Sequence, residues 1–268
     1  MIGFAHSKLN LGLSIVSKRP DGFHNLETIF YPLPLHDVVE IVSSAEDRFI
    51  STGLKVSDNE ADNLVLRAYY LLKKKYPQIS ALEIHLHKAI PIGAGMGGGS
   101  SDAAKVIQLI DRFFDLDIPP AQLLAFALEL GSDCPFFMQS KAVFASGRGE
   151  ILEQVELDLT AYSFLLIHPE THINTSWAFS KIKAASPKYN LRKCIQEPIQ
   201  NWVKTIHNDF EQPVFEAYPQ LLEIKNQLYD SGAIYASMTG SGSTLYGIFN
   251  KSAFRKIDVE KASQSFLR

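Results

Sequence analysis

A glycine-rich stretch, PIGAGMGGGSS at residues 91–101, constrains the fold of this chain more than any other feature. The segment before it, residues 81–90, alternates apolar and polar side chains and predicts a strand. The segment after it predicts an amphipathic helix, because apolar residues recur with helical spacing at Ala103, Ile107, Ile110 and Phe114. No spacer separates the glycines from either segment. We therefore expect a tight loop between a strand and a helix, and a flexible linker is the weaker interpretation.

The composition of this loop suits the binding of phosphate groups. Glycine lets backbone N–H groups come close to an anion, and the following helix turns the positive end of its dipole toward the same point. The hydroxyls of Ser100 and Ser101 add hydrogen-bond donors, or one oxygen ligand for a phosphate-bound Mg²⁺. We therefore predict that the loop cradles a triphosphate.

Two other phosphate-binding loops fit less well. A P-loop requires a lysine directly after its last glycine, and here Ser100 follows Gly99, so this type is excluded. The dinucleotide fingerprint GxGxxG is matched in form by Gly93, Gly95 and Gly98. Its confirming context is a second strand that follows the helix and ends in an acidic residue, whereas residues 113–126 run into another helix. The dinucleotide interpretation is therefore the weaker alternative.

Length and composition predict a globular chain with a small-molecule partner. The 268 residues are 46% hydrophobic, and the formal net charge of −3 gives no basic field for nucleic acid. No basic leader precedes an apolar run, and no window reaches the roughly 20 apolar residues of a spanning helix, so we expect no membrane partner. The two cysteines, Cys134 and Cys194, form no disulfide framework and fit a reducing compartment. We expect a soluble, cytoplasmic protein.

The rest of the chain mixes strands and helices without regular alternation. Residues 5–15 predict a strand with one polar face, which carries Lys8 and Asn10. Asn63 is placed to cap one helix, and Gly131 to end another that covers 119–130. Further strands are predicted at 37–42, on both sides of a turn at 147–149, and at 163–167, 233–238 and 244–249, and further helices at 175–184, 195–206 and 219–230. This mixture favours an α+β fold over a doubly wound sheet.

Three segments taken together resemble the GHMP kinase superfamily. They are AHSKLNLGLSI at 5–15, PIGAGMGGGSSDAA at 91–104 and MTGSGSTLYGIF at 238–249. Within that superfamily, RPDGFHNLETIF, GSDCPFF and NDFE resemble the branch that transfers the γ-phosphate of ATP to the 2-hydroxyl of a cytidine-diphosphate-linked methylerythritol, a step of the non-mevalonate isoprenoid (MEP) route. The resemblance spans nearly the whole chain and is thinnest between residues 184 and 206 and over the last fifteen residues.

The resemblance implies a two-domain GHMP kinase fold of the α+β class, with ATP and the alcohol meeting in the cleft between the domains. A polar stretch at 153–162 suggests the boundary, so we predict an ATP-phosphate-binding domain at 1–155 and a C-terminal domain at 156–268. The implied cofactors are ATP and Mg²⁺. The expected partner is the cytidine-bearing small molecule alone, and the expected state is a monomer or a weak homodimer.

The resemblance also assigns site residues by motif. Lys8 and Asp133 match the catalytic pair, and Ser101, whose hydroxyl lies in the glycine loop, is expected to meet Mg²⁺ through ATP. The phosphates are assigned to Pro91, Gly93, Gly95, Gly97, Gly98, Gly99, Ser100 and Ser101. The alcohol and its cytosine are assigned to Asn10, Phe23, His24, Phe30, Phe179, Gly240 and Ser241.

The chemistry is consistent with these assignments, although each has a purely structural alternative. Phosphoryl transfer to an alcohol needs positioning, charge neutralisation and a group that accepts the hydroxyl proton, and a lysine and a carboxylate supply the last two. Lys8 has an alternative as an edge-strand lysine that reaches solvent, and Asp133 as a helix cap. His85 and His87 share a strand face and suggest either a metal site or, more simply, a solvated face. Cys134 is interpreted as a small buried side chain.

Two other functions remain open on the sequence. A GHMP kinase for another small alcohol, such as homoserine or mevalonate, would keep the phosphate loop and lose the cytosine role of residues 21–30. A nucleotide-binding regulator without catalysis would keep only the nucleotide site, and the presence of both Lys8 and Asp133 argues against it.

Overall fold

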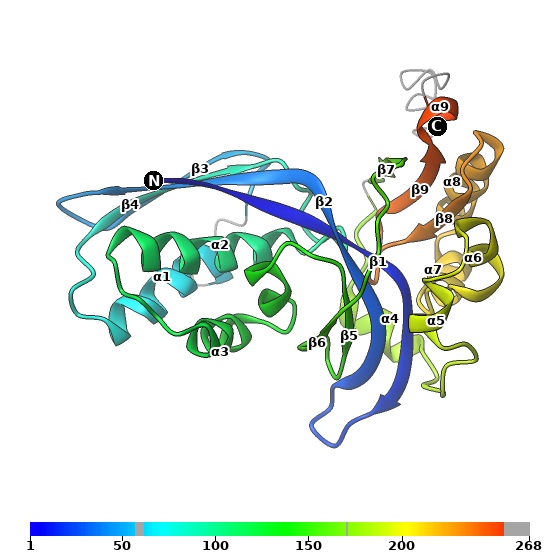
Figure 1. Ribbon diagram of the computed structural model, residues 1–268, viewed down its shortest axis with the longest axis horizontal. Coiled ribbons are helices and arrows are strands. Elements are labelled where there is room, and N and C mark those ends of the chain that lie inside the picture. The colour runs from blue at the N-terminus through cyan, green and yellow to red at the C-terminus, as the bar shows by residue number, and fades with distance from the viewer. Residues whose placement is uncertain (57–61, 170, 255–268) are drawn as a thin grey trace. The chain divides into compact units, whose positions relative to one another are not determined.

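The computed structural model describes residues 1–56, 62–169 and 171–254, and these form two compact units (Figure 1). Unit 1 comprises Met1–Lys8, Pro32–Ile92 and Gly97–Lys141. Unit 2 comprises Leu9–Tyr31, Gly93–Met96 and the chain from Ala142 onward. Compactness thus divides the chain into interleaved pieces, because two long N-terminal strands run through both units. The contiguous domain boundary between residues 155 and 156, and the cleft between the domains, stay predictions.

Unit 1 combines a sheet with a layer of helices. Its elements are parts of β1 (Ile2–Lys18) and β2 (His24–Ser43), together with β3 (Arg48–Gly53), α1 (Leu64–Lys75), β4 (Leu82–Lys88), α2 (Gly98–Phe113), α3 (Pro120–Leu130) and the 3₁₀ helix η2 (Cys134–Met138). Strand β4 pairs antiparallel with the second half of β2, with Ile41 opposite Ile84, and parallel with β3. Helices α1, α2 and α3 lie on one side of β3 and β4 (Figure 1).

The core of unit 1 forms between that sheet and those helices. Buried side chains of β2, β4, α1, α2 and α3 make one cluster, which includes Ile84 and the predicted helix positions Ala103, Ile107 and Ile110. Asn63 caps α1 as predicted, since its side chain accepts a hydrogen bond from the N–H of Val65. The predicted strand, glycine loop and helix are therefore confirmed as β4, the loop and α2.

Unit 2 contains part of a six-stranded sheet, to which β3 and β4 also belong, and a separate three-stranded sheet, with helices beside them. Its elements are parts of β1 and β2 together with β5 (Val143–Ser146), β6 (Ile151–Gln154), β7 (Tyr162–Ile167), α4 (Thr175–Lys181), α5 (Leu191–Cys194), α6 (Ile199–Thr205), α7 (Glu211–Ala217), α8 (Pro219–Asp230), β8 (Tyr235–Met238), β9 (Leu245–Asn250) and α9 (Lys251–Phe254). Strand β5 pairs antiparallel with the first half of β2 and with β6, and β9 lies between β7 and β8.

The predicted elements of unit 2 are largely confirmed. The turn at 147–149 lies between β5 and β6, and residues 239–244 join β8 to β9. The helix predicted at 175–184 ends earlier, at Lys181, and the one predicted at 195–206 is the shorter helix α6, at Ile199–Thr205. Strand β3 and the helices η2, α5, α7 and α9 were not predicted, because each is short and lacks a clear apolar period.

The polar face of β1 differs from the prediction in one respect. Alternation is normal for a strand with one solvated face, yet His6, Lys8 and Asn10 are buried, as are Ser7 and Leu9 between them. Polar and charged groups are costly to bury unless they have partners or a function. The face that carries them is therefore the strongest candidate for a functional site.

Within the described part of the chain, none of the helices has the length and apolar character needed to cross a bilayer.

Candidate active site

The glycine loop has a backbone that only glycine adopts easily. Gly93, Gly95 and Gly97 have φ angles of 66°, 76° and 69°, in the left-handed region that disfavours side chains. The residues between them, Ala94 and Met96, are buried. The loop thus alternates left-handed glycines with buried anchors, which explains why every second residue from 93 to 97 is glycine.

The glycines also differ in the space around them. A Cβ atom at Gly95 would lie 2.1 Å from the carbonyl oxygen of Thr239, and one at Gly97 would lie 2.6 Å from the ring of Phe137. At Gly93 and Gly99 a Cβ atom would meet nothing closer than 3.7 Å. The central glycines therefore permit close packing, while Gly93 and Gly99 are exposed and leave backbone open to a ligand.

Helix α2 begins at the end of this loop without a side-chain cap. Gly97 occupies the N-cap position and, being glycine, has no side chain that could accept a hydrogen bond from the first turn. Free N–H groups and the helix dipole make such an end favourable for an anion. Ser100 is half-buried, whereas Ser101 is buried, so Ser100 offers the more accessible hydroxyl. The loop and helix together fit a phosphate chain, and the assignment of Ser101 to Mg²⁺ stays a prediction.

Lys8 and Asp133 lie together in unit 1, as the motif match predicts. The Nζ atom of Lys8 is 3.8 Å from Oδ2 of Asp133, and the Lys8 side chain is 4% exposed against 37% for Asp133. Burial lowers the pKa of the Lys8 ammonium, and the nearby Asp133 carboxylate partly offsets this effect. The same lysine borders the loop, because a Cβ atom at Gly97 would lie 3.4 Å from Cε of Lys8. A buried cation, an accessible carboxylate and the Gly97 end of the loop therefore lie together in unit 1.

The structure argues against the purely structural alternatives for Lys8 and Asp133. A lysine that reaches solvent would be exposed at its tip, and Lys8 is buried along its length. Asp133 does stand at the N-cap position of η2, but its side chain makes no capping hydrogen bond there. Its carboxylate is therefore available to another partner.

A second group of buried charges lies behind the loop in unit 1. The Lys88 ammonium forms ion pairs with Asp37 and with Oδ2 of Asp102, the latter at 2.8 Å. All three side chains are buried. Burial raises the pKa of Asp102 to about 7; Lys88 opposes this shift and Asp37 adds to it. Sequence reasoning did not single out this group, although Lys88 and Asp102 flank the loop in the chain.

The residues assigned to cytosine include an aromatic pair in unit 2. The rings of His24 and Phe179 stack with centroids 5.0 Å apart and an interplanar angle of 21°. Phe210 packs edge-on against Phe179 at 4.9 Å and fixes its orientation. Because His24 and Phe179 contact each other directly, a base would stack on the outside of the pair or would have to separate the rings.

The other two phenylalanines behave differently from each other. Phe23 is 53% exposed, and the Arg148 guanidinium lies 4.8 Å from its ring centroid. Phe30 is only 2% exposed and packs as a core residue. Arg148 was not predicted, although it lies in the turn at 147–149 that the sequence identified. The cytosine role of Phe30 stays a prediction that its burial does not favour.

Asn10 has extensive hydrogen bonding within unit 2. Its Nδ2 atom donates to Oγ1 of Thr28 at 3.0 Å, and its Oδ1 atom accepts from Oγ1 of Thr239 at 3.2 Å. Thr239 also has its Oγ1 atom 3.1 Å from the carbonyl oxygen of Gly95. Thr239 therefore connects β1, the glycine loop and the turn after β8, a role that its place in the motif MTGSGS could have suggested.

The turn after β8 holds the assigned residues Gly240 and Ser241. Asn208 donates from Nδ2 to the carbonyl oxygens of Met238 at 2.8 Å and Gly240 at 2.9 Å. Ser241 and Thr175 have their hydroxyl oxygens 3.2 Å apart. The NDFE motif that includes Asn208 thus acts on this turn, and both assigned residues are half-buried.

His85 and His87 have local hydrogen-bonding partners, and Cys134 is a buried thiol. His85 lies 2.8 Å from Glu83, and Nδ1 of His87 lies 2.9 Å from the Thr52 hydroxyl. Among the described residues, no cluster of three or more His, Cys, Asp or Glu side chains could hold a metal ion. Cys134 is buried, and burial raises its pKa to about 11, so its thiol is neutral at physiological pH.

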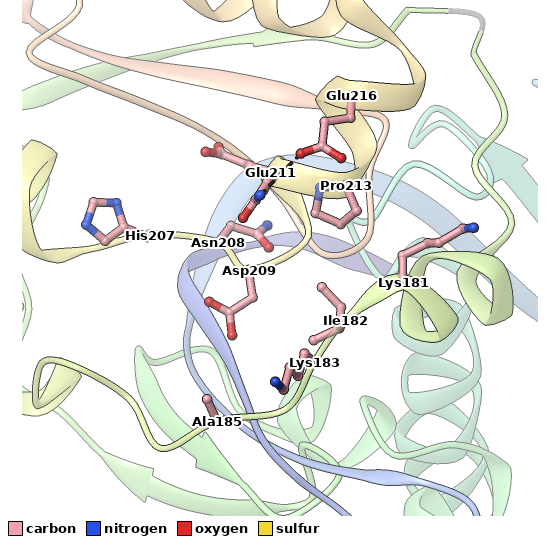
Figure 2. Close-up of a pocket in the computed structure, with 11 residues that line it drawn as sticks. Lys181, Ile182, Lys183, Ala185, His207, Asn208, Asp209, Glu211, Pro213 and Glu216 are labelled. Atoms are coloured by element: carbon pink, nitrogen blue, oxygen red, sulfur yellow. Dashed lines mark hydrogen bonds between the residues drawn. The ribbon is translucent and has the colours of Figure 1, made fainter.

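Unit 2 also has a cavity of about 590 Å³ apart from these residues (Figure 2). It is lined by side chains that follow α4, including Lys183 and Ala185, and by others before and along α7, including Asp209 and Glu216. Oδ2 of Asp209 accepts a hydrogen bond from the N–H of Ile15 at 2.7 Å, which links this wall to β1. Its lining includes Asn208, Asp209 and Glu211 of the NDFE motif but none of the residues assigned to the phosphates, the alcohol or the cytosine.

Comparison with known proteins defines the class. The profile "GHMP kinases N terminal domain" matches residues 63–141, and "GHMP kinases C terminal" matches residues 190–260. A crystal structure of mevalonate kinase has a TM-score of 0.69 with 15% identity, over 98% of this chain and 96% of that one, so the two share a fold. Fold and profiles together are those of an ATP-dependent small-molecule kinase.

More similar proteins define the family. A 4-diphosphocytidyl-2-C-methyl-D-erythritol kinase of Parabacteroides distasonis is 47% identical over 251 residues, which cover 94% of this chain and 92% of that protein. A crystal structure of 4-(cytidine 5'-diphospho)-2C-methyl-D-erythritol kinase has a TM-score of 0.82 with 27% identity, over 99% of this chain and 95% of that one. The chain belongs to the GHMP kinases and, among them, to the family of the 4-diphosphocytidyl-2-C-methyl-D-erythritol kinases.

Proposed function

We propose that this kinase transfers the γ-phosphate of ATP to the 2-hydroxyl of 4-diphosphocytidyl-2-C-methyl-D-erythritol, in the non-mevalonate route to isoprenoids. One observation carries the proposal: buried Lys8 lies against Gly97 of the phosphate loop with its ammonium 3.8 Å from Asp133. The alcohol is taken from the relatives, which are named for this substrate.

The glycine loop and α2 are proposed to bind the phosphates. Exposed N–H groups around Gly93 and Gly99 would donate to phosphate oxygens, and the uncapped first turn of α2 would stabilise their charge. Mg²⁺, when bound, would neutralise further charge on the phosphates, with Ser101 as its proposed protein ligand and Ser100 beside it. Catalysis of this type depends mainly on position and charge.

Asp133 and Lys8 are proposed to activate the alcohol. The Asp133 carboxylate accepts the proton of the 2-hydroxyl as the oxygen attacks the γ-phosphorus, and the bond to the leaving ADP oxygen breaks. The buried Lys8 ammonium stabilises the negative charge that develops on the attacking and transferred oxygens. Burial suits this task, since an ammonium shielded from water interacts more strongly with such charge.

The aromatic residues of unit 2 are proposed to recognise the cytosine. His24 has a ring that can both stack and exchange hydrogen bonds, and Phe179 provides an apolar face beside it. Phe23 with Arg148 offers a second exposed aromatic surface. We assign Asn10, Gly240 and Ser241 to the surroundings of the alcohol, with Asn10 acting in part through the hydrogen bonds that hold Thr239.

We propose that the chain acts in the cytoplasm as a monomer or weak homodimer, with no nucleic-acid or membrane partner. The near-neutral net charge and the supply of Lys8, Asp133 and the phosphate loop by one chain support this proposal. Sedimentation at micromolar concentration tests it, and an obligate higher oligomer would contradict it.

The substrate is tested by measuring ADP release together with mass spectrometry of the product. MgATP is offered with 4-diphosphocytidyl-2-C-methylerythritol, homoserine or mevalonate. We expect turnover with the cytidine-bearing alcohol alone and one added phosphoryl group, located at the 2-hydroxyl by phosphorus NMR. Turnover with another alcohol alone would overturn the cytosine assignment and keep the phosphate site. ATP binding without turnover of any alcohol would support a nucleotide-binding regulator without catalytic activity.

A further inference from the structure

The two ends of the glycine loop are tied to one buried cluster of charges in unit 1. Lys88 is the last residue of β4, where the chain enters the loop, and Asp102 is in α2, just after it leaves. Nζ of Lys88 is 2.8 Å from Oδ2 of Asp102. This bond joins positions 14 residues apart across the loop.

Asp37 holds the same cluster from the neighbouring strand β2. Its carboxylate pairs with Lys88, and its Oδ1 atom accepts hydrogen bonds from the N–H groups of Ala89 at 2.6 Å and Ile90 at 2.8 Å. These are the first two residues after β4. Asp37 therefore fixes both the charge and the backbone at the start of the loop.

The far end of the loop packs onto the same lysine. A Cβ atom at Gly98 would lie 2.8 Å from Nζ of Lys88 and 3.0 Å from Cγ2 of Ile90. Gly98 is the first residue of α2, so the helix begins directly on the side chains that end β4. The first residue of α2 is therefore packed closely against the Lys88 side chain, with no room for a Cβ atom between them.

Close packing between β4 and α2 does not by itself require the buried charges of Asp37, Lys88 and Asp102. Three buried ionisable groups are costly, and an apolar set of similar volume is often at least as stable. The Oδ1 atom of Asp102 is buried with no hydrogen-bond partner among the described residues, which adds to that cost. Directional bonds, however, fix geometry better than apolar contacts do, and a phosphate loop needs fixed geometry.

We propose that Asp37, Lys88 and Asp102 are positioning residues that hold both ends of the glycine loop in its phosphate-binding form. They act through the loop and touch no substrate. A preset loop loses little conformational freedom when a triphosphate binds, so the cluster increases nucleotide affinity. This inference rests on the proposed phosphate-binding role of the loop.

The test measures the Kd of the ATP analogue AMP-PNP with Mg²⁺, which requires no alcohol. Asp102→Ala removes the tie to Lys88 and is expected to raise this Kd about tenfold. Asp102→Asn keeps a carbonyl oxygen for Lys88 and is expected to stay within about threefold of wild type. The matched control is Val106→Ala, which opens a cavity one turn further along α2 and should lower stability with an unchanged Kd.

The outcomes separate the two proposals. A wild-type chain that does not bind AMP-PNP overturns the phosphate site and this inference together. A wild type that binds, with an Asp102→Ala variant that binds equally well, overturns the positioning role alone. An equal rise in Val106→Ala would also overturn it, since the effect would then follow stability. If Asp102→Ala does not fold, Asp102→Ser replaces it, because the shorter serine side chain cannot reach Lys88 in the same way. We expect the same rise in the Kd for AMP-PNP, and an unchanged Kd in this variant would overturn the positioning role.

Discussion

The proposed chemistry in unit 1 depends on buried charges, whereas the proposed recognition in unit 2 depends on partly exposed rings. Lys8 and the cluster around Lys88 are buried and held by ion pairs. His24 and Phe23 lie nearer the surface, and the contacts of His24 with Phe179 are ring against ring. The comparison suggests a division of labour. Groups that stabilise developing charge need low dielectric and fixed geometry, while a base can be stacked by side chains that adjust.

The same contrast predicts how each region responds to mutation. Loss of a charge in unit 1 should affect turnover or the stability of the loop, because its partners are left unpaired in a dry environment. Loss of a ring assigned to the cytosine, such as that of His24, should affect the KM for the alcohol alone. Four measurements follow, from the largest expected effect to the smallest.

Asp133→Asn should cause the largest loss. If this carboxylate accepts the hydroxyl proton, kcat should fall by about two to four orders of magnitude while the Kd for AMP-PNP stays near wild type. ADP release and AMP-PNP titration measure the two quantities. The matched control is Asp158→Asn, the same change at an exposed carboxylate of unit 2, which should leave kcat unchanged. Wild-type turnover in Asp133→Asn would remove the residue from this role.

Gly95→Ala should be the most destabilising change in the loop. The alanine would have to keep the positive φ of Gly95, and its methyl group would lie 2.1 Å from the carbonyl oxygen of Thr239. We therefore expect the free energy of unfolding to fall by about 3 kcal/mol. Gly22→Ala is the control, since Gly22 has a φ of 86° with no atom within 4 Å and should lose only about 1 kcal/mol. Equal losses in urea denaturation would mean that the close approach to Thr239 does not matter.

His6 provides a pH test of burial in unit 1. Its ring packs against Phe136 and Phe137, and burial, with smaller effects from Lys105 and His36, lowers its pKa to about 4. As pH falls below about 6.5, the unfolded chain therefore binds a proton that the folded chain does not, and stability decreases. His6→Gln removes this effect.

The expected size of the His6 effect is about 2 kcal/mol. Between pH 7.5 and pH 5, the free energy of unfolding of His6→Gln should rise by that amount relative to wild type. Urea denaturation of both proteins at the two pH values measures the difference. A difference that does not change with pH would show that the imidazole titrates alike in the folded and unfolded chains.

His24→Ala should have the smallest and most selective effect. Loss of one stacking ring should raise the KM for the cytidine-bearing alcohol about tenfold and leave the KM for ATP unchanged. Phe164→Ala is the control and should leave the alcohol KM unchanged. It removes a ring from another stacked pair of unit 2, in which the ring centroids of Phe164 and Tyr31 lie 5.7 Å apart. An unchanged alcohol KM in His24→Ala would favour a kinase for a different alcohol.

The sequence alone determined the elements whose signals are local. The strand and helix on either side of the glycine loop, the Asn63 cap and the turn at 147–149 each depend on neighbours in the chain, and all are present. The predicted catalytic pair required the family resemblance, since Lys8 and Asp133 are 125 positions apart and neither has a distinctive local pattern.

Only the tertiary structure decided which polar groups would be buried and with whom. Alternation placed Lys8 and Asn10 on one face of β1, but packing against other elements made that face an interior one. Likewise, the ties between Lys88 and Asp37, and between Thr239 and Gly95, join distant residues by directional bonds. Chain periodicity specifies the face of an element. The burial of that face, and hence its pKa values and its chemistry, depends on what the rest of the chain places against it.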